Sequence, residues 1–188
     1  MDKTQVGLWR PIAEVLRLSA EENVVRWKPI RRIRMYAERL PRPALFSANG
    51  LSSEGWRFTI RALDLRITDA IRWNGRHYFL TSIVQTPARP GFLTVEAAKV
   101  KLVDCVAAKE TTCPGPAFQA VLTEKYIRHE QHSPDAVNLI CYVLVTPKCV
   151  ALAPGSLVEI DGAPYEVLVA HKLDEAKNEY ECLRKADL

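Results

Sequence analysis

The acid–base side chains that lie closest together in this sequence stand around residue 132. His129 and His132 precede Ser133 and Asp135, and these residue types can transfer protons when they are held in a fixed geometry. The segment around them is polar, however, and a histidine in a polar loop is usually only solvated. We therefore predict no catalytic residues and no enzymatic activity, and we assign His129 and His132 to a partner-contacting surface.

Thiol and imidazole groups show no spacing that suits a metal site. The chain has five cysteines and four histidines, with no Cys-x-x-Cys pair and no paired histidine ligands, whereas zinc sites need such closely spaced ligands. Lys148 precedes Cys149, and a neighbouring ammonium can lower the pKa of a thiol, but a single lysine is a weak signal. Glycine-rich phosphate-binding loops are also missing from the sequence. We predict buried, structural cysteines, no metal and no cofactor.

Basic residues gather between positions 26 and 34, close to Trp27 and Tyr36. Arginine interleaved with aromatic residues is typical of surfaces that bind single-stranded nucleic acid. A basic strand that faces an acidic partner protein has the same composition. With a further arginine in the loop 85–91, the residues predicted to bind a partner are Arg26, Arg31, Arg32, Arg34, Arg89, His129 and His132.

Charge is distributed unevenly along the chain. The net charge is +5 over residues 1–45, +3 over residues 46–112 and −4 over residues 113–188. Such a gradient suits a protein with two electrostatically different faces. No apolar run approaches the roughly 18 residues that span a bilayer, and the N-terminus lacks the apolar core of a signal peptide. We expect no membrane contact and a reducing cytoplasm as the place of synthesis.

Period-two alternation and tight turns predict an all-β protein. Apolar residues alternate with Arg57, Thr59 and Arg61 after Trp56, which is typical of a half-buried strand. Asn74-Gly75 lies between two apolar runs and predicts a two-residue hairpin. A basic strand is predicted to begin near residue 27. The remaining strands are predicted near 57–63, 69–73, 76–84, 93–105, 140–146, 156–160, 164–171 and 179–184.

The second half of the chain repeats this pattern at an offset of 87 residues. Asp161-Gly162 takes the place of Asn74-Gly75, and Tyr165 takes the place of Tyr78. Beyond a shorter loop, Val100 is expected to correspond to Tyr180. Turn, tyrosine and apolar phase agree together, which favours duplication over two unrelated hairpins. The predicted core is Trp56, Phe58, Ile60, Ile71, Trp73, Tyr78, Leu80, Val143, Val145, Val158, Ile160, Tyr165 and Val167.

The domain organisation follows from this repeat. We predict two tandem small β-barrel or sandwich modules, at residues 27–107 and 108–188, after an N-terminal extension at residues 1–26. Pro11 at a first helical position and a capping box at residues 19–22 predict a short helix in that extension. An edge strand over residues 12–18 is the alternative.

Residues 58–105 resemble the head–tail connector proteins of tailed bacteriophages, the adaptor, stopper or head-closure group. In that group a segment like ITDAIRWNGRHYFLTSIV, here residues 67–84, is followed by a variable loop and a closing strand like KVKLVDC, here residues 99–105. The resemblance covers about residues 27–107 and extends more faintly over residues 114–186. It implies a small barrel-like fold that forms rings between portal and tail. This chain differs from the group in carrying two copies.

The resemblance implies a structural virion protein of the phage neck, assembled in the host cytoplasm. Its partners would be copies of itself in a ring of six or twelve chains, portal or adaptor and tail proteins, and double-stranded DNA in transit. Six chains with two modules each would present twelve similar modules, matching the portal and tail symmetries that the resemblance implies. The alternative function is a nucleic-acid-binding protein made of tandem OB-like or SH3-like barrels.

Overall fold

All regular structure in this protein is β-structure. A computed structural model describes residues 11–21, 24–40, 54–85, 89–108, 117–129, 138–172 and 174–185. Across those ranges there is no helix, and so none able to cross a membrane. The predicted all-β class is therefore confirmed. The strands are β1 (Ile12–Glu21), β2 (Val24–Leu40), β3 (Gly55–Arg61), β4 (Ala70–Trp73), β5 (Arg76–Gln85), β6 (Phe92–Val100), β7 (Leu102–Ala107), β8 (Ala117–His129), β9 (Asn138–Pro147), β10 (Leu157–Ile160), β11 (Ala163–His171) and β12 (Lys177–Arg184).

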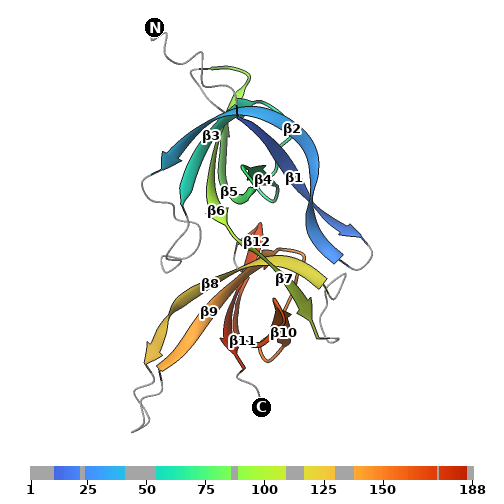
Figure 1. The fold of residues 1–188 in the computed structure, drawn as a ribbon, viewed down its shortest axis with the longest axis vertical. Helices are drawn as coiled ribbons and strands as arrows, with labels where there is room; N and C mark the ends of the chain where they lie inside the picture. Colours follow the sequence, from blue (N-terminus) through green and yellow to red (C-terminus); the bar gives the residue numbers. More distant parts are fainter. Residues whose placement is uncertain are drawn as a thin grey trace. The chain divides into compact units, whose positions relative to one another are not determined.

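The chain divides into two compact units. The first comprises residues 1–18, 27–47 and 52–101, and the second comprises residues 19–26, 48–51 and 102–188. Strands of the first unit pair in the order β1-β4-β5-β6-β3-β2, and an additional β1–β2 pairing closes the ring of six. Figure 1 shows these strands curving around a common interior. Closure gives each strand a neighbour on both sides over at least part of its length.

The second unit has a closed pairing of its own. Its order is β7-β10-β11-β12-β9-β8, and the β7–β8 pairing closes it. The two rings have the same strand order. Each strand of the second ring has a label six higher than the strand at the equivalent position of the first ring, so that β7 corresponds to β1 and β10 to β4. The beginning of β2 also belongs here, because Val24 and Val25 pair in parallel with Ala117 and Phe118 of β8.

Both predicted hairpin turns are present. Asn74 and Gly75 have φ of 50° and 70°, and Asp161 and Gly162 have φ of 47° and 81°. Two successive positive φ values define the turn whose twist matches antiparallel strands. Asn and Asp accept the first of these positions because they tolerate left-handed backbone better than other side chains.

Finer details of the two hairpins also recur at the offset of 87. In the turn before β4, the Arg66 N–H donates to Asp69 Oδ2 at 3.0 Å; before β10, the Ala153 N–H donates to Ser156 Oγ at 3.2 Å. The register then shifts between Leu80 and Ser82 in β5 and between Val167 and Val169 in β11. Each shift is a β-bulge, which bends its strand.

Inward-facing apolar side chains fill each unit. In the first unit Phe58, Ile60, Tyr78 and Leu80 are at most 2 % exposed. The predicted core is confirmed for most of its members, while Trp56, Trp73 and Val143 are only partly buried. Trp56 and Trp73 still pack on that core, edge to face at 5.1 Å. In the second unit the fully buried residues include Leu144, Leu152, Val158, Val167, Tyr180 and Cys182.

The predicted N-terminal helix is wrong, because residues 12–21 form strand β1. Ala13 and Val15 are buried while Ile12 is exposed, which is the period of a strand. Glu14 lies opposite Arg72 of β4 and accepts a hydrogen bond from its Nε at 2.8 Å. Ser19 Oγ donates to Glu21 at 2.7 Å instead of capping a helix. Closing the barrel requires an extended segment here, and this requirement overrides local helix signals.

Two further expectations need correction. The single strand predicted at 93–105 is two strands, β6 and β7, separated by Lys101, and β8 was not predicted. The expected correspondence of Val100 with Tyr180 does not fit the registers. Tyr180 lies opposite Ala170 of β11, as Val95 lies opposite Ile83 of β5, and Ala170 stands 87 residues after Ile83. By strand pairing Tyr180 therefore corresponds to Val95.

A buried ion pair holds the connection between β3 and β4. Asp69 is 2 % exposed, and its carboxylate accepts hydrogen bonds from Arg17 Nε at 3.0 Å and Nη2 at 2.9 Å. Arg17 also donates to the backbone oxygen of Asp64 at 3.1 Å. A paired and hydrogen-bonded carboxylate tolerates burial, whereas an unpaired one does not. This pair fixes the path of residues 62–69, of which Ala62 and Leu63 line the pocket described below.

Gly75 provides a direct test of the turn geometry. No atom lies within 4 Å of a Cβ built there, so a side chain would add backbone strain and no collision. We expect Gly75→Val to lower the free energy of unfolding by about 2 kcal/mol, the scale of left-handed strain in a residue with a Cβ. Gly75→Asn should cost much less, because asparagine tolerates positive φ. Urea titration measures both; equal losses would contradict the assigned turn.

Candidate functional site

The candidate site opens where β2 separates from β3. The two strands are registered from Met35↔Ile60 to Leu40↔Gly55 and no farther. β3 meanwhile stays with β6, because Arg61 lies opposite Phe92 and the Ala62 N–H donates to the Gly91 oxygen at 2.8 Å. The two strands therefore leave a space between the basic part of β2 and residues 61–63.

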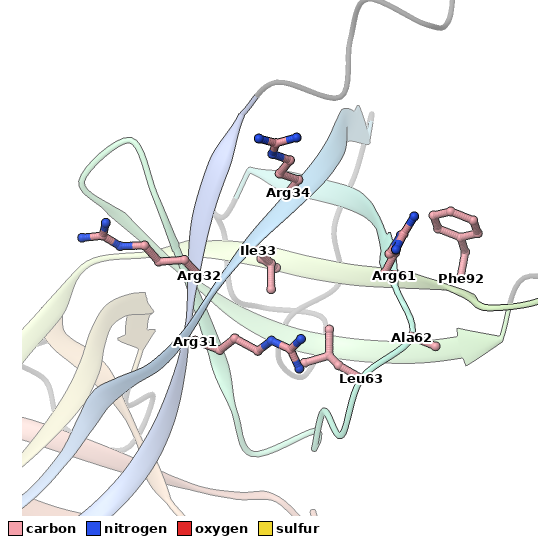
Figure 2. Close-up of a pocket in the computed structure, with 8 residues that line it drawn as sticks. All are labelled: Arg31, Arg32, Ile33, Arg34, Arg61, Ala62, Leu63 and Phe92. Carbon is pink, nitrogen blue, oxygen red and sulfur yellow. The ribbon is translucent and has the colours of Figure 1, made fainter.

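This space is a pocket of about 540 Å³ in the first unit. Its lining combines arginines with apolar side chains and contains no acidic residue: Arg31, Arg32, Ile33, Arg34, Arg61, Ala62, Leu63 and Phe92. Figure 2 shows Arg31 extending from β2 toward Leu63 and Arg61 lying beside Phe92. Arg32 points away from Arg31 and Arg61. The interior side is closed by Ile33, which is 8 % exposed and belongs to the core.

The charges of the pocket are compensated unequally. Arg32 contacts Glu14 at 3.5 Å. Among the residues that the structure describes, Arg31, Arg34 and Arg61 have no carboxylate within ion-pairing distance, although all three are exposed. Guanidinium groups present planar, paired donors that suit carboxylates and phosphates. The pocket is thus a cationic site with an apolar floor, able to bind an anionic group.

The structure gathers only part of the predicted partner-binding set at this site. Arg31, Arg32 and Arg34 line the pocket. Arg89 is exposed in the turn that leads to Phe92, whose N–H donates to the Arg89 oxygen at 3.2 Å. Arg26 is exposed but belongs to the second unit.

Of the two predicted histidines, the structure describes only the backbone of His129. His129 is the last residue of β8, opposite Asn138, and belongs to the second unit. His132, Ser133 and Asp135 lie outside the described residues, so the predicted histidine surface stays a prediction.

Sequence analysis missed Arg61, Leu63 and Phe92. A signal for Arg61 was present, because it ends the polar series Arg57, Thr59, Arg61 on β3. Its proximity to Arg31 could not be read from the sequence, since the two residues are brought together by the β2–β3 pairing and its end at Met35. Leu63 and Phe92 carry no sequence signal that separates them from core residues.

Other reactive groups in the described parts of the chain do not form a second site. Burial raises the pKa of Cys105 and that of Cys182 to about 12, which keeps these thiols protonated and unreactive. Cys149 is exposed, but the neighbouring Lys148 Nζ donates to the backbone oxygen of Lys172 at 2.7 Å. Within the described ranges, no three His, Cys, Asp or Glu side chains come close enough to hold a metal.

In the second unit, the segment that follows β9 is held by side-chain hydrogen bonds to its backbone. After β9, residues 148–152 are tied to the barrel by Tyr180, whose hydroxyl donates to the Val150 oxygen at 2.9 Å and accepts from the Leu152 N–H at 3.0 Å. Asn178 Nδ2 also donates to the Val150 oxygen at 2.9 Å. Tyr180 corresponds to Val95 by strand pairing, and valine has no hydroxyl with which to tie residues 62–66 in this way.

Comparison of this chain with protein-family models, curated proteins and solved structures finds no match.

The buried thiols give a test at alkaline pH. Both pKa values lie above the ordinary value of 9.0, so ionisation favours the unfolded chain, and stability present below pH 9 is lost as the pH rises toward 12. Between pH 9 and pH 10 we expect a loss of about 1 kcal/mol for each thiol.

Urea unfolding of a Cys105→Ala/Cys182→Ala variant should therefore depend less on pH in this range than wild type does. Cys149→Ala, which removes an exposed thiol, should keep the wild-type dependence. Identical pH dependence of wild type and the double variant would show that these thiols do not govern alkaline unfolding.

Proposed function

We propose that this chain is a structural building block, formed by fusing two copies of one six-stranded barrel, that assembles into a ring. The observation that carries the proposal is the agreement of the two units in strand order. A structural subunit needs rigid modules and surfaces for neighbours, and its function does not depend on an active site.

Details beyond strand order support the duplication. Any two small barrels share some topology, but barrel closure alone does not dictate the type of a turn or the site of a bulge. Here the positive-φ pair, the side-chain-capped turn before it and the bulge after it all recur 87 residues apart. Common descent from one module explains these coincidences together.

The resemblance to head–tail connectors indicates where such a ring would act. We place the protein in the neck of a tailed phage, as a ring between portal or adaptor and tail proteins through which double-stranded DNA passes. A head-to-tail ring needs two different faces on each subunit. The change from +5 over residues 1–45 to −4 over residues 113–188 provides them. Assembly would take place in the host cytoplasm, and the protein would act in the virion without enzymatic activity.

Ring formation can be measured on the purified full chain. We expect native mass spectrometry to detect six or twelve copies, and cryo-electron microscopy to show a closed ring with a channel. Six copies would match twelve modules to a twelve-fold neighbour. Raising the salt concentration should weaken the ring if opposite charges join neighbouring copies. A chain that stays monomeric over the full accessible concentration range, with or without portal and tail proteins, contradicts the proposal.

A further inference from the structure

We infer that the basic pocket of the first unit binds an extended acidic segment of a partner protein. This inference goes beyond the proposed function, because a ring could form without any ligand in this pocket. It rests on three features of the pocket: guanidinium groups on two walls that no carboxylate of the described residues neutralises, a stretch of β2 that is no longer registered with β3, and an apolar floor.

The charge argument concerns Arg31, Arg34 and Arg61. They approach the same space from β2 and from the end of β3, and no acidic side chain of the described residues neutralises them. Like charges on facing walls repel each other, and an anion between them relieves the repulsion. Carboxylates are well matched to guanidinium groups, which can bind them through two parallel hydrogen bonds.

The backbone of β2 offers a second means of binding. The Met35 N–H donates to the Pro11 oxygen at 3.3 Å, so Met35 directs its hydrogen-bonding groups toward the β1 side. In a strand these directions alternate, so Arg34 directs its groups toward Arg61 at the end of the β2–β3 register, and Arg32 directs its groups toward the side where that register has ended. An extended peptide can add a strand at such a place, with its backbone bonded to β2 and alternate side chains in the pocket.

The floor adds an apolar requirement. Ile33, Leu63 and Phe92 line the pocket between the arginines, and a volume of about 540 Å³ falls within the range of compact ligand sites. The matching segment therefore carries acidic residues with an apolar side chain among them. Burial of that side chain excludes water and strengthens the surrounding ion pairs.

A nucleic acid would need a different surface. Strands of nucleic acid require a continuous track of positive charge with free aromatic faces. Around the pocket, neighbouring cations are already paired: Arg57 with Glu96 at 2.8 Å and Arg39 with Glu54 at 3.6 Å. The ring of Trp27 packs against Phe79 at 4.7 Å. The pocket gathers three arginines around one space without such ion pairs, which favours a short acidic segment over a long strand of nucleic acid.

The test uses the full chain and three fluorescein-labelled probes. The first is a short peptide in which Glu alternates with Val, the second has Gln in place of each Glu, and the third is a single-stranded oligothymidine of similar length. Fluorescence anisotropy is measured for wild type, for Arg31→Glu/Arg61→Glu, and for the milder Arg31→Gln/Arg61→Gln. The matched control is Arg66→Glu/Arg76→Glu, which makes the same charge change at exposed residues of this unit outside the pocket lining.

We expect the acidic peptide to bind wild type and to lose about tenfold or more in affinity when both pocket arginines are changed, because the charge-assisted hydrogen bonds to its carboxylates are lost. The control variant should bind nearly as well as wild type, and the Gln peptide should bind weakly. Circular dichroism confirms folding, and the Arg→Gln variant keeps the test valid if charge reversal unfolds the unit.

Three results would overturn the inference: no binding of the acidic peptide, equal losses in the pocket and control variants, or tighter binding of oligothymidine through the same arginines. The last would instead establish a nucleic-acid site. Because none of these measurements depends on oligomeric state, failure here leaves the ring proposal standing, and a monomeric protein could still bind the peptide.

Discussion

Closure of six strands into a ring is the constraint on which the rest of this structure depends. A closed pairing removes most of the exposed edge that an open sheet would have, but so few strands must coil strongly to meet. The bulges in β5 and β11 supply bending at equivalent places. Positive-φ turns keep β4–β5 and β10–β11 in register. Recruiting β1 into the first ring also explains why a segment with helix-capping residues is extended.

The pocket arises at a place where closure is incomplete. β2 is registered with β3 over six residues and then diverges, whereas β3 continues beside β6. In a continuous sheet the side chains of β2 and β3 would lie side by side. At the pocket, the side chains of β2 and those at the end of β3 lie on opposite sides of an opening. Arginines suit this position because their aliphatic stems cover apolar surface while their charged ends stay in water. A cationic opening with an apolar floor follows from the strand path together with the composition of β2.

The segments that follow β3 and β9 are held in different ways in the two units. In the second unit, Tyr180 and Asn178 tie residues 148–152 to the barrel through backbone hydrogen bonds. In the first unit, Val95 takes the place of that tyrosine by strand pairing, and the segment after β3 is held instead by the Arg17–Asp69 pair. The two units thus have the same strand order but use different side chains to hold the segments after β3 and β9.

The sequence by itself determined the features that depend on neighbouring residues. Asn74-Gly75 and Asp161-Gly162 specify their turns through the φ values that these residues accept, and alternation after Trp56 specifies a half-buried strand. The 87-residue repeat was visible because turns and apolar phase are local. Tertiary structure alone decided three features. Residues 12–21 form a strand, Tyr180 corresponds to Val95, and Arg31 and Arg61 line the same pocket. Each of these depends on pairing between strands distant in sequence, and a bulge or an early end of pairing shifts partners without leaving a local mark.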